Sequence, residues 1–211
     1  MLELFLSAFT TLFVVIDPPG CAPIYAGLTK EASDAERRSM AIRAVVIATA
    51  ILLVFALFGE ALLGALNIEL DAFRIAGGLM LFLIALDMVF EKRTQRREQR
   101  AERILAESEG KPETEDVSVF PMAMPTLAGP GAITSIMLLN AKADGLEGSL
   151  VVLGALAAVL LLTLAALLAA APLMRLAGKR VEAVITRLLG VLLAALAAQF
   201  VINGLRGSFG L

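Results

Sequence analysis

The stretch Ile-Asp-Pro-Pro-Gly at residues 16–20 places a carboxylate and two prolines in an otherwise apolar run, where Glu3 and Lys30 are the nearest other charges. Proline has no backbone N–H, so the two prolines cannot donate to the carbonyls of Val14 and Val15 as a continuous helix requires. Inside a membrane such a break persists only where protein or a polar cavity satisfies the backbone. The stretch therefore predicts a membrane helix that is broken beside an acid.

A second stretch, Ala-Gly-Pro-Gly-Ala at residues 128–132, interrupts the apolar run between Asp116 and Lys142 in the same way. A single proline is an ordinary kink in a membrane helix. Two breaks with the same Pro-Gly core, one of them carrying an acid, are instead typical of transporters whose broken helices each contribute half of a substrate site.

The composition indicates an integral membrane protein. Hydrophobic residues make up 59% of the 211 residues, the mean hydropathy is +0.85, and several uncharged runs exceed the roughly 20 residues that span a bilayer as a helix. The net charge of −2 argues against a nucleic-acid partner. With no histidine and Cys21 as the only cysteine, neither an intrachain disulfide nor a Cys/His metal site is expected, and no cofactor is implied.

The pattern predicts an all-α membrane protein with six transmembrane helices, of which the first and the fourth are broken. Ser33 is a candidate N-cap for the second helix. Residues 92–117 carry charges of both signs and separate a first three-helix repeat, 1–91, from a second, 118–211. The expected spans cover residues 2–24, 41–63, 72–90, 119–140, 148–168 and 184–204.

The two halves resemble each other in register. The Pro-Gly pairs at 19–20 and 130–131 stand 111 positions apart, and the Arg-x-x-Gly openings at 74–77 and 187–190 stand 113 apart. Because each repeat has three spans, the second must enter the bilayer upside down relative to the first. This is the inverted-topology design of many secondary transporters, with the substrate bound near the midplane.

Basic residues predict the orientation, because they accumulate in cytoplasmic loops. The loops after the first, third and fifth spans hold thirteen lysines and arginines, whereas the opposite side holds only Lys142 and Arg206. We therefore expect the linker at 92–117 to be cytoplasmic and both termini to lie outside.

A zwitterionic amino acid suits the two breaks chemically. The N–H groups that begin a half-helix attract a carboxylate, while freed carbonyls and an acid attract an ammonium. The ammonium is thus assigned to the carbonyls of Val14 and Val15 with Asp17 nearby, and the carboxylate to N–H groups after either Pro-Gly pair. Thr134 and Ser135 place two hydroxyls just after the second break. Gln199 and Asn203 place two amides on one face of the sixth span, where they are expected to point inward. Helix packing explains each of these pairs equally well. The candidate substrate-binding residues are Val14, Val15, Asp17, Pro18, Pro19, Gly20, Gly129, Pro130, Gly131, Thr134, Ser135, Gln199 and Asn203.

Four motifs resemble those of the MarC family and together cover nearly the whole chain. They are Asp-Pro-Pro-Gly at 17–20, Phe-Arg-Ile-Ala-Gly-Gly at 73–78, Phe-Pro-Met-Ala-Met-Pro at 120–125 leading into Ala-Gly-Pro-Gly at 128–131, and Gln-Phe-Val-Ile-Asn-Gly at 199–204. Members of this family are also called neutral amino acid transporters. The resemblance implies a six-span protein of the bacterial inner membrane that moves small neutral amino acids such as glycine or alanine.

Other functions are weighed against this one. A passive channel for small solutes would share the broken helices but show neither saturation nor coupling to a proton or sodium gradient. An enzyme is not expected, because the spans offer neither a nucleophile with a base nor a pair of acids. A purely structural membrane protein would have no need of an intramembrane Asp17.

Overall fold

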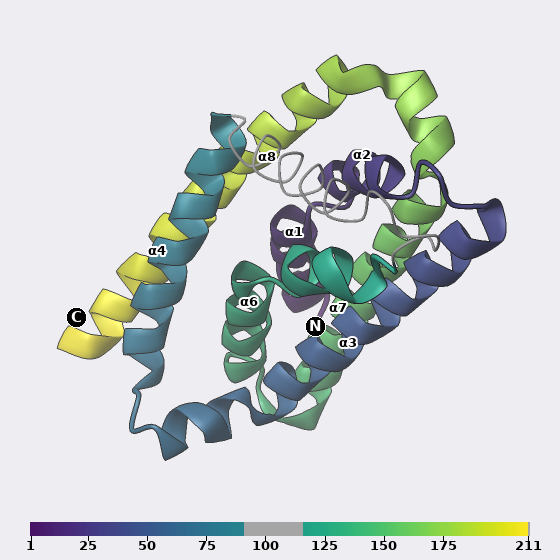
Figure 1. Cartoon of the computed structure of the whole chain (residues 1–211). Helices are drawn as coiled ribbons and strands as arrows, with labels where there is room; N and C mark the ends of the chain where they lie inside the picture. The colour runs from purple at the N-terminus through teal and green to yellow at the C-terminus, as the bar shows by residue number, and fades with distance from the viewer. Residues whose placement is uncertain (91–115, 211) are drawn as a thin grey trace.

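The computed structural model describes residues 1–90 and 116–210, with the side chains of 173–183 excepted. The described chain is helical throughout its regular structure, as expected (Figure 1). Most of the predicted linker at 92–117 lies outside the described residues. The helices are α1 (Leu2–Ile16), α2 (Pro18–Leu28), α3 (Asp34–Ala65), α4 (Leu70–Val89), the irregular segment η1 (Ser118–Leu127), in which Phe120 and Met124 have extended backbone, α6 (Pro130–Ala141), α7 (Gly145–Leu168) and α8 (Ala170–Phe209).

Both predicted breaks are found, and they differ in geometry. The first separates α1 from α2 within one apolar stretch, Leu2–Leu28, that is long enough to cross a membrane. The second separates η1 from α6, and the chain bends there by 54°. With this bent pair counted as one span, the described chain has up to six candidate spans, in agreement with the number expected from hydropathy.

The connections between spans were predicted less well than the spans. Ser33 is the N-cap of α3, and it forms a capping box in which its Oγ accepts from the Glu36 N–H at 3.3 Å and its N–H donates to Glu36 Oε2 at 2.8 Å. This cap starts the helix at Asp34, seven residues before the expected span. The loop implied between the fifth and sixth expected spans, 169–183, is not found, because α8 begins at Ala170 and its backbone is helical through that segment.

The two halves are interleaved rather than side by side. Helix α1 packs on α7, α3 packs on η1 and α6, and α4 packs along α8 (Figure 1). Polar contacts tie α3 to the later part of the chain: Arg43 pairs with Asp116, just before η1, at 2.7 Å, and the Asn140 Nδ2 of α6 donates to the Ala56 carbonyl at 2.8 Å.

Glycines allow α4 and α8 to approach closely. A Cβ at Gly78 would lie 2.8 Å from the Ala197 carbonyl oxygen, and one at Gly204 would lie 2.7 Å from the Asp71 carbonyl oxygen. Small residues let membrane helices pack backbone against backbone in this way. Since positions early in α4 face positions late in α8, the two helices run antiparallel. These are the third spans of the two halves, so their opposed directions match an inverted repeat.

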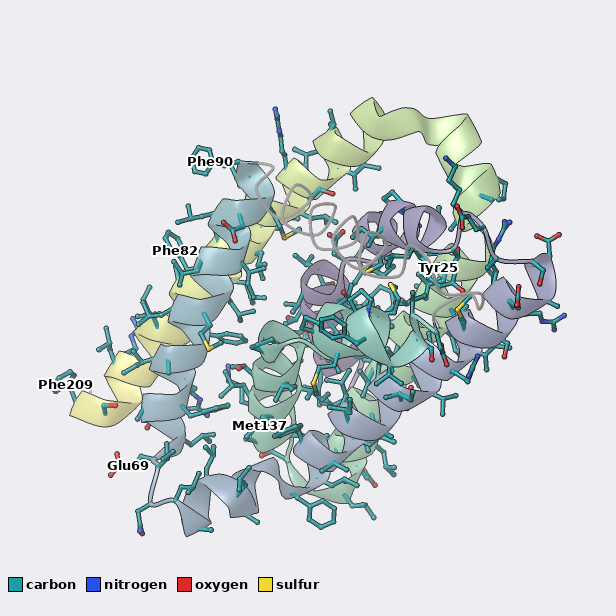
Figure 2. All side chains as sticks on the ribbon, in the orientation of Figure 1. Tyr25, Glu69, Phe82, Phe90, Met137 and Phe209 are labelled. Carbon is teal, nitrogen blue, oxygen red and sulfur yellow. The ribbon has the colours of Figure 1, made fainter. Side chains whose placement is uncertain are left out.

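Burial is uneven among the spans. In Leu2–Leu28, 56% of the most apolar 18-residue window is buried, against 28% in α4 and 28% in the last span. Phe82, Phe90 and Phe209 instead point outward from α4 and α8 (Figure 2). The broken helix thus lies in the protein interior, where its backbone can find polar partners, while α4 and α8 present large apolar side chains outward.

Candidate functional site

Asp17 forms the first break by itself. Its backbone is left-handed (φ 58°, ψ 63°), a conformation that aspartate tolerates better than most residues, and its N–H donates to the Phe13 carbonyl at 2.9 Å. Its carboxylate Oδ1 accepts from the Gly20 N–H at 3.2 Å and so caps α2, whose first residue is Pro18. One residue therefore ends α1 and begins α2, and it is only 1% exposed.

The cap explains the glycine that follows the prolines. A Cβ at Gly20 would lie 2.2 Å from Asp17 Oδ2, so the capping carboxylate occupies the space that a side chain would need. Val14 and Val15 are both buried just before the break, and Pro18 and Pro19 have no N–H to donate to their carbonyls. The role of these carbonyls and of Asp17 toward a substrate stays a prediction.

The second break lacks such a cap. Gly129 is the N-cap residue of α6 and Pro130 its first residue, but among the described residues no side chain caps the N–H groups of the first turn. A Cβ at Gly129 would lie 2.4 Å from the Pro125 carbonyl oxygen, so only glycine fits there. The two half-helices α2 and α6 therefore differ: the first N-terminus is occupied by a carboxylate of the chain, and the second is not.

The two breaks lie against each other. A Cβ at Gly131 would be 3.2 Å from Val15 Cγ1 and 2.8 Å from Ile84 Cδ1, so the first turn of α6 touches both the end of α1 and the middle of α4. Gly131 and Val15 are therefore neighbours, and their assignment to one substrate site stays a prediction.

The two hydroxyls after the second break have different surroundings. Thr134 is packed on α4, because a Cβ at Gly77 would lie 2.1 Å from its Cγ2. Ser135 is 0% exposed, and its Oγ has no hydrogen-bond partner among the described residues. Ser135 follows Gly131 by one turn on the same face, and helical side chains lean toward the N-terminus. Ser135 thus lies one turn past the break, on the same face as Gly131.

The two amides of α8 lie elsewhere. Gln199 Nε2 donates to Asn203 Oδ1 at 2.8 Å, and Gln199 is exposed, so the expectation that both amides point inward is wrong for Gln199. A Cβ at Gly78 would contact both Ala197 and Val201, so Gln199 lies at the level of Gly78, about one turn from Leu81, which the second break contacts. Asn203 lies one turn further away, beside the contact of Gly204 with Asp71. The exposure of Gln199, rather than its level, keeps its amide from the breaks.

A cavity of about 460 Å³ between α1 and α8 reaches the first break. Its wall includes Val14, three residues before Asp17, and three hydroxyl residues that the sequence reasoning missed. Their spacing along one side of α1 is the signal that could have identified them. The cavity is lined by Leu6, Ser7, Thr10, Thr11, Val14, Leu192 and Leu196.

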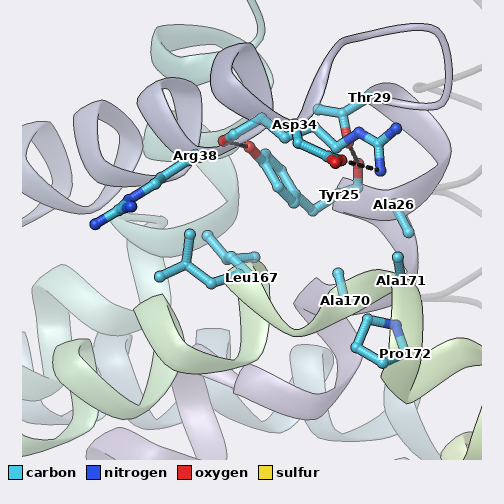
Figure 3. A pocket seen from close by; sticks show the side chains of 11 residues that line it. Tyr25, Ala26, Thr29, Asp34, Arg38, Leu167, Ala170, Ala171 and Pro172 are labelled. Atoms are coloured by element: carbon cyan, nitrogen blue, oxygen red, sulfur yellow. Dashed lines mark hydrogen bonds and ion pairs between the residues drawn. The ribbon is translucent and has the colours of Figure 1, made fainter.

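A second cavity, of about 470 Å³, lies beyond the other end of α2, where α3 begins and α7 meets α8 (Figure 3). The buried Tyr25 hydroxyl donates to the Arg37 carbonyl, and the Thr29 hydroxyl donates to the Tyr25 carbonyl at 2.7 Å. Leu167 and Ala170 form an apolar wall opposite these groups. The two cavities thus lie toward opposite ends of the broken span.

The comparisons with known proteins agree with the motifs. The model of the MarC family of integral membrane proteins matches residues 2–209. The chain belongs to the MarC family. It is 39% identical to the UPF0056 membrane protein MJ1677 of Methanocaldococcus jannaschii over 207 residues, 98% of each chain. It is 33% identical to the UPF0056 membrane protein YvbG of Bacillus subtilis over 209 residues, 99% of this chain and 97% of the relative.

A third relative bears on location. The chain is 31% identical to the UPF0056 inner membrane protein YhgN of Escherichia coli over 204 residues, 95% of each chain. No solved structure matches this MarC-family chain. Family membership establishes an integral membrane protein, and a substrate is named neither by the family description nor by these three relatives.

Proposed function

We propose that this protein is a secondary transporter that moves small neutral amino acids, of the size of glycine or alanine, across the inner membrane by alternating access. The observation that carries the proposal is the contact between the two breaks, where Gly131 at the start of α6 meets Val15 at the end of α1. Transporters with inverted repeats bind their substrates between such broken helices.

The two half-helix ends favour one orientation of the substrate. Asp17 already caps α2, so the substrate carboxylate is better placed at the start of α6, where no described side chain caps the first turn. The helix dipole and the N–H groups there attract an anion. The buried Ser135 hydroxyl, which has no hydrogen-bond partner within the described part of the chain, supports this placement. The ammonium then faces the carbonyls at the end of α1 and the Asp17 carboxylate.

The cavities supply access from two sides. The α1–α8 cavity reaches Val14, and the cavity beside Tyr25 lies past the far end of α2. Alternating access requires that the substrate site open first to one side and then to the other. From the distribution of basic residues, we propose that the first cavity opens to the outside and the second to the cytoplasm, with both termini outside.

Flux measurements in proteoliposomes test the proposal. Radiolabelled glycine and alanine should enter with saturable kinetics, and an imposed proton or sodium gradient should change the accumulated amount. A matched control is Lys30→Gln, because Lys30 is exposed in a loop away from both breaks and its replacement should leave flux unchanged. Flux that never saturates and ignores both gradients would identify a passive channel instead, and absence of amino acid flux would refute the proposed substrate.

A further inference from the structure

A positively charged cluster lies at the end of the molecule opposite the cavity beside Tyr25. Lys142 ends α6 as its C-cap residue, and its Nζ lies 5.3 Å from the centre of the Phe200 ring of α8. Within the described ranges Lys142 makes no ion pair. The ring attracts the ammonium through a cation–π contact. Because the ring has no hydrogen-bond acceptor atom, the ammonium can still donate its N–H groups to an anion.

The register of α4 against α6 brings Arg74 to the same place. A Cβ at Gly77 would touch Thr134 and Leu138, and the two helices run in opposite directions there. Arg74 precedes Gly77 by one turn, and Lys142 follows Leu138 by one turn, so both basic side chains lie at one level. Lys142 is an exposed residue, but partial burial of its ammonium and then the nearby Arg74 charge lower the pKa of Lys142.

A carboxylate already pairs with one of these two cations. Arg74 Nη1 pairs with Asp71 Oδ1 at 2.6 Å, and Asp71 is itself held against α8, where a Cβ at Gly207 would lie 2.2 Å from its Oδ2. The Arg74 Nε is buried and has no hydrogen-bond partner in the described part of the chain. A buried N–H donor without an acceptor is unfavourable, and so is the repulsion between two neighbouring cations. An anion bound between Arg74 and Lys142 relieves both.

We propose that Arg74 and Lys142 together bind one oxyanion at this end of the molecule, separate from the broken-helix site. The guanidinium and the ammonium donate charge-assisted hydrogen bonds to the same carboxylate or phosphate group. Two sources share this chemistry: the carboxylate of an amino acid approaching the transporter, which rests on the proposed function, and the phosphate of a lipid headgroup, which does not. Asp71 orients Arg74 for either.

Chemical labelling of Lys142 measures occupancy of this site without any transport assay. The purified full chain is treated with an amine-acylating reagent, and labelling of Lys142 and of Lys30 is followed by mass spectrometry. Glycine, acetate and dimethyl phosphate are compared with chloride at equal ionic strength. A bound oxyanion shields the ammonium and raises its pKa, so acylation of Lys142 should halve when the ligand concentration equals the dissociation constant. Lys30, exposed in the loop after α2, should label at an unchanged rate.

Substitutions test whether the slower acylation depends on Arg74 and Lys142 together. Arg74→Lys keeps a cation and should keep the protection, whereas Arg74→Gln should abolish it. If Arg74→Gln fails to fold, Lys142→Met, which keeps an apolar stem against Phe200, should lose binding of labelled acetate or dimethyl phosphate in equilibrium dialysis. Protection by glycine and acetate identifies the solute as the source, and protection by dimethyl phosphate alone identifies the lipid. If none of the three slows acylation, or if Arg74→Gln keeps full protection, the site does not exist, whatever the flux assay shows.

Discussion

The role of Asp17 can be tested by two substitutions that separate its charge from its capping function. Asp17→Asn keeps an oxygen that can accept from the Gly20 N–H, and asparagine also tolerates the left-handed backbone at this position. Asp17→Ala loses the cap and leaves a residue that is unsuited to φ 58°. The first change removes chiefly the charge, and the second removes the structure of the break as well.

The expected magnitudes follow from this geometry. Loss of the cap costs about 1 kcal/mol, and placing alanine in the left-handed region costs about 1 kcal/mol more, so Asp17→Ala should destabilise the protein by about 2 kcal/mol. Asp17→Asn loses only the favourable charge at the start of α2, about 0.3–1 kcal/mol. If the carboxylate also holds the substrate ammonium, the lost charged hydrogen bond is worth about 1.5–3 kcal/mol, or roughly 10- to 100-fold in transport efficiency.

The assay pairs stability with flux for each variant. Unfolding in detergent is followed by the helical circular-dichroism signal. The free energy of unfolding should decrease from wild type to Asp17→Asn to Asp17→Ala. Glycine and alanine flux in proteoliposomes should be severely reduced in Asp17→Asn although the protein is folded and inserted. If Asp17→Asn transports like the wild type while Asp17→Ala is misfolded or poorly expressed, Asp17 is only a cap, and its assignment to the substrate is wrong.

Three further predictions concern the breaks, the packing and the topology. Replacing both Pro19 and Pro130 by alanine should restore N–H donors and continuous helix, so the protein should insert but lose most transport; undiminished flux would contradict the broken-helix site. Gly78→Ala should destabilise the α4–α8 pair by about 1–3 kcal/mol, because its Cβ would meet Val201 at 2.7 Å, whereas Gly154→Ala, which meets nothing within 4 Å, should not destabilise it; equal unfolding free energies would refute the close packing. A reporter that is active only in the cytoplasm should be active when fused within residues 95–110 and inactive at the C-terminus, and the opposite pattern would reverse the proposed orientation.

Features that depend on local chemistry could be predicted from the sequence alone. Hydropathy located the spans, because length and apolarity are properties of each segment. The Pro-Gly pairs located both breaks, since a missing N–H acts within one turn. Ser33 was recognised as an N-cap because its partner is only three residues away. The extension of α8 back to Ala170 was not predicted, because three basic residues placed this segment in a loop and hydropathy alone does not show that a loop is helical.

Contacts between distant segments were decided only by the tertiary structure. The approach of Gly131 to Val15 and the pairing of α4 with α8 depend on how six spans pack, which no single segment encodes. The same packing turned Gln199 outward and brought Lys142 beside Arg74. In a membrane the apolar faces of all helices are alike in hydropathy, so partners are chosen by shape, by glycines that permit close approach and by buried polar groups that need each other.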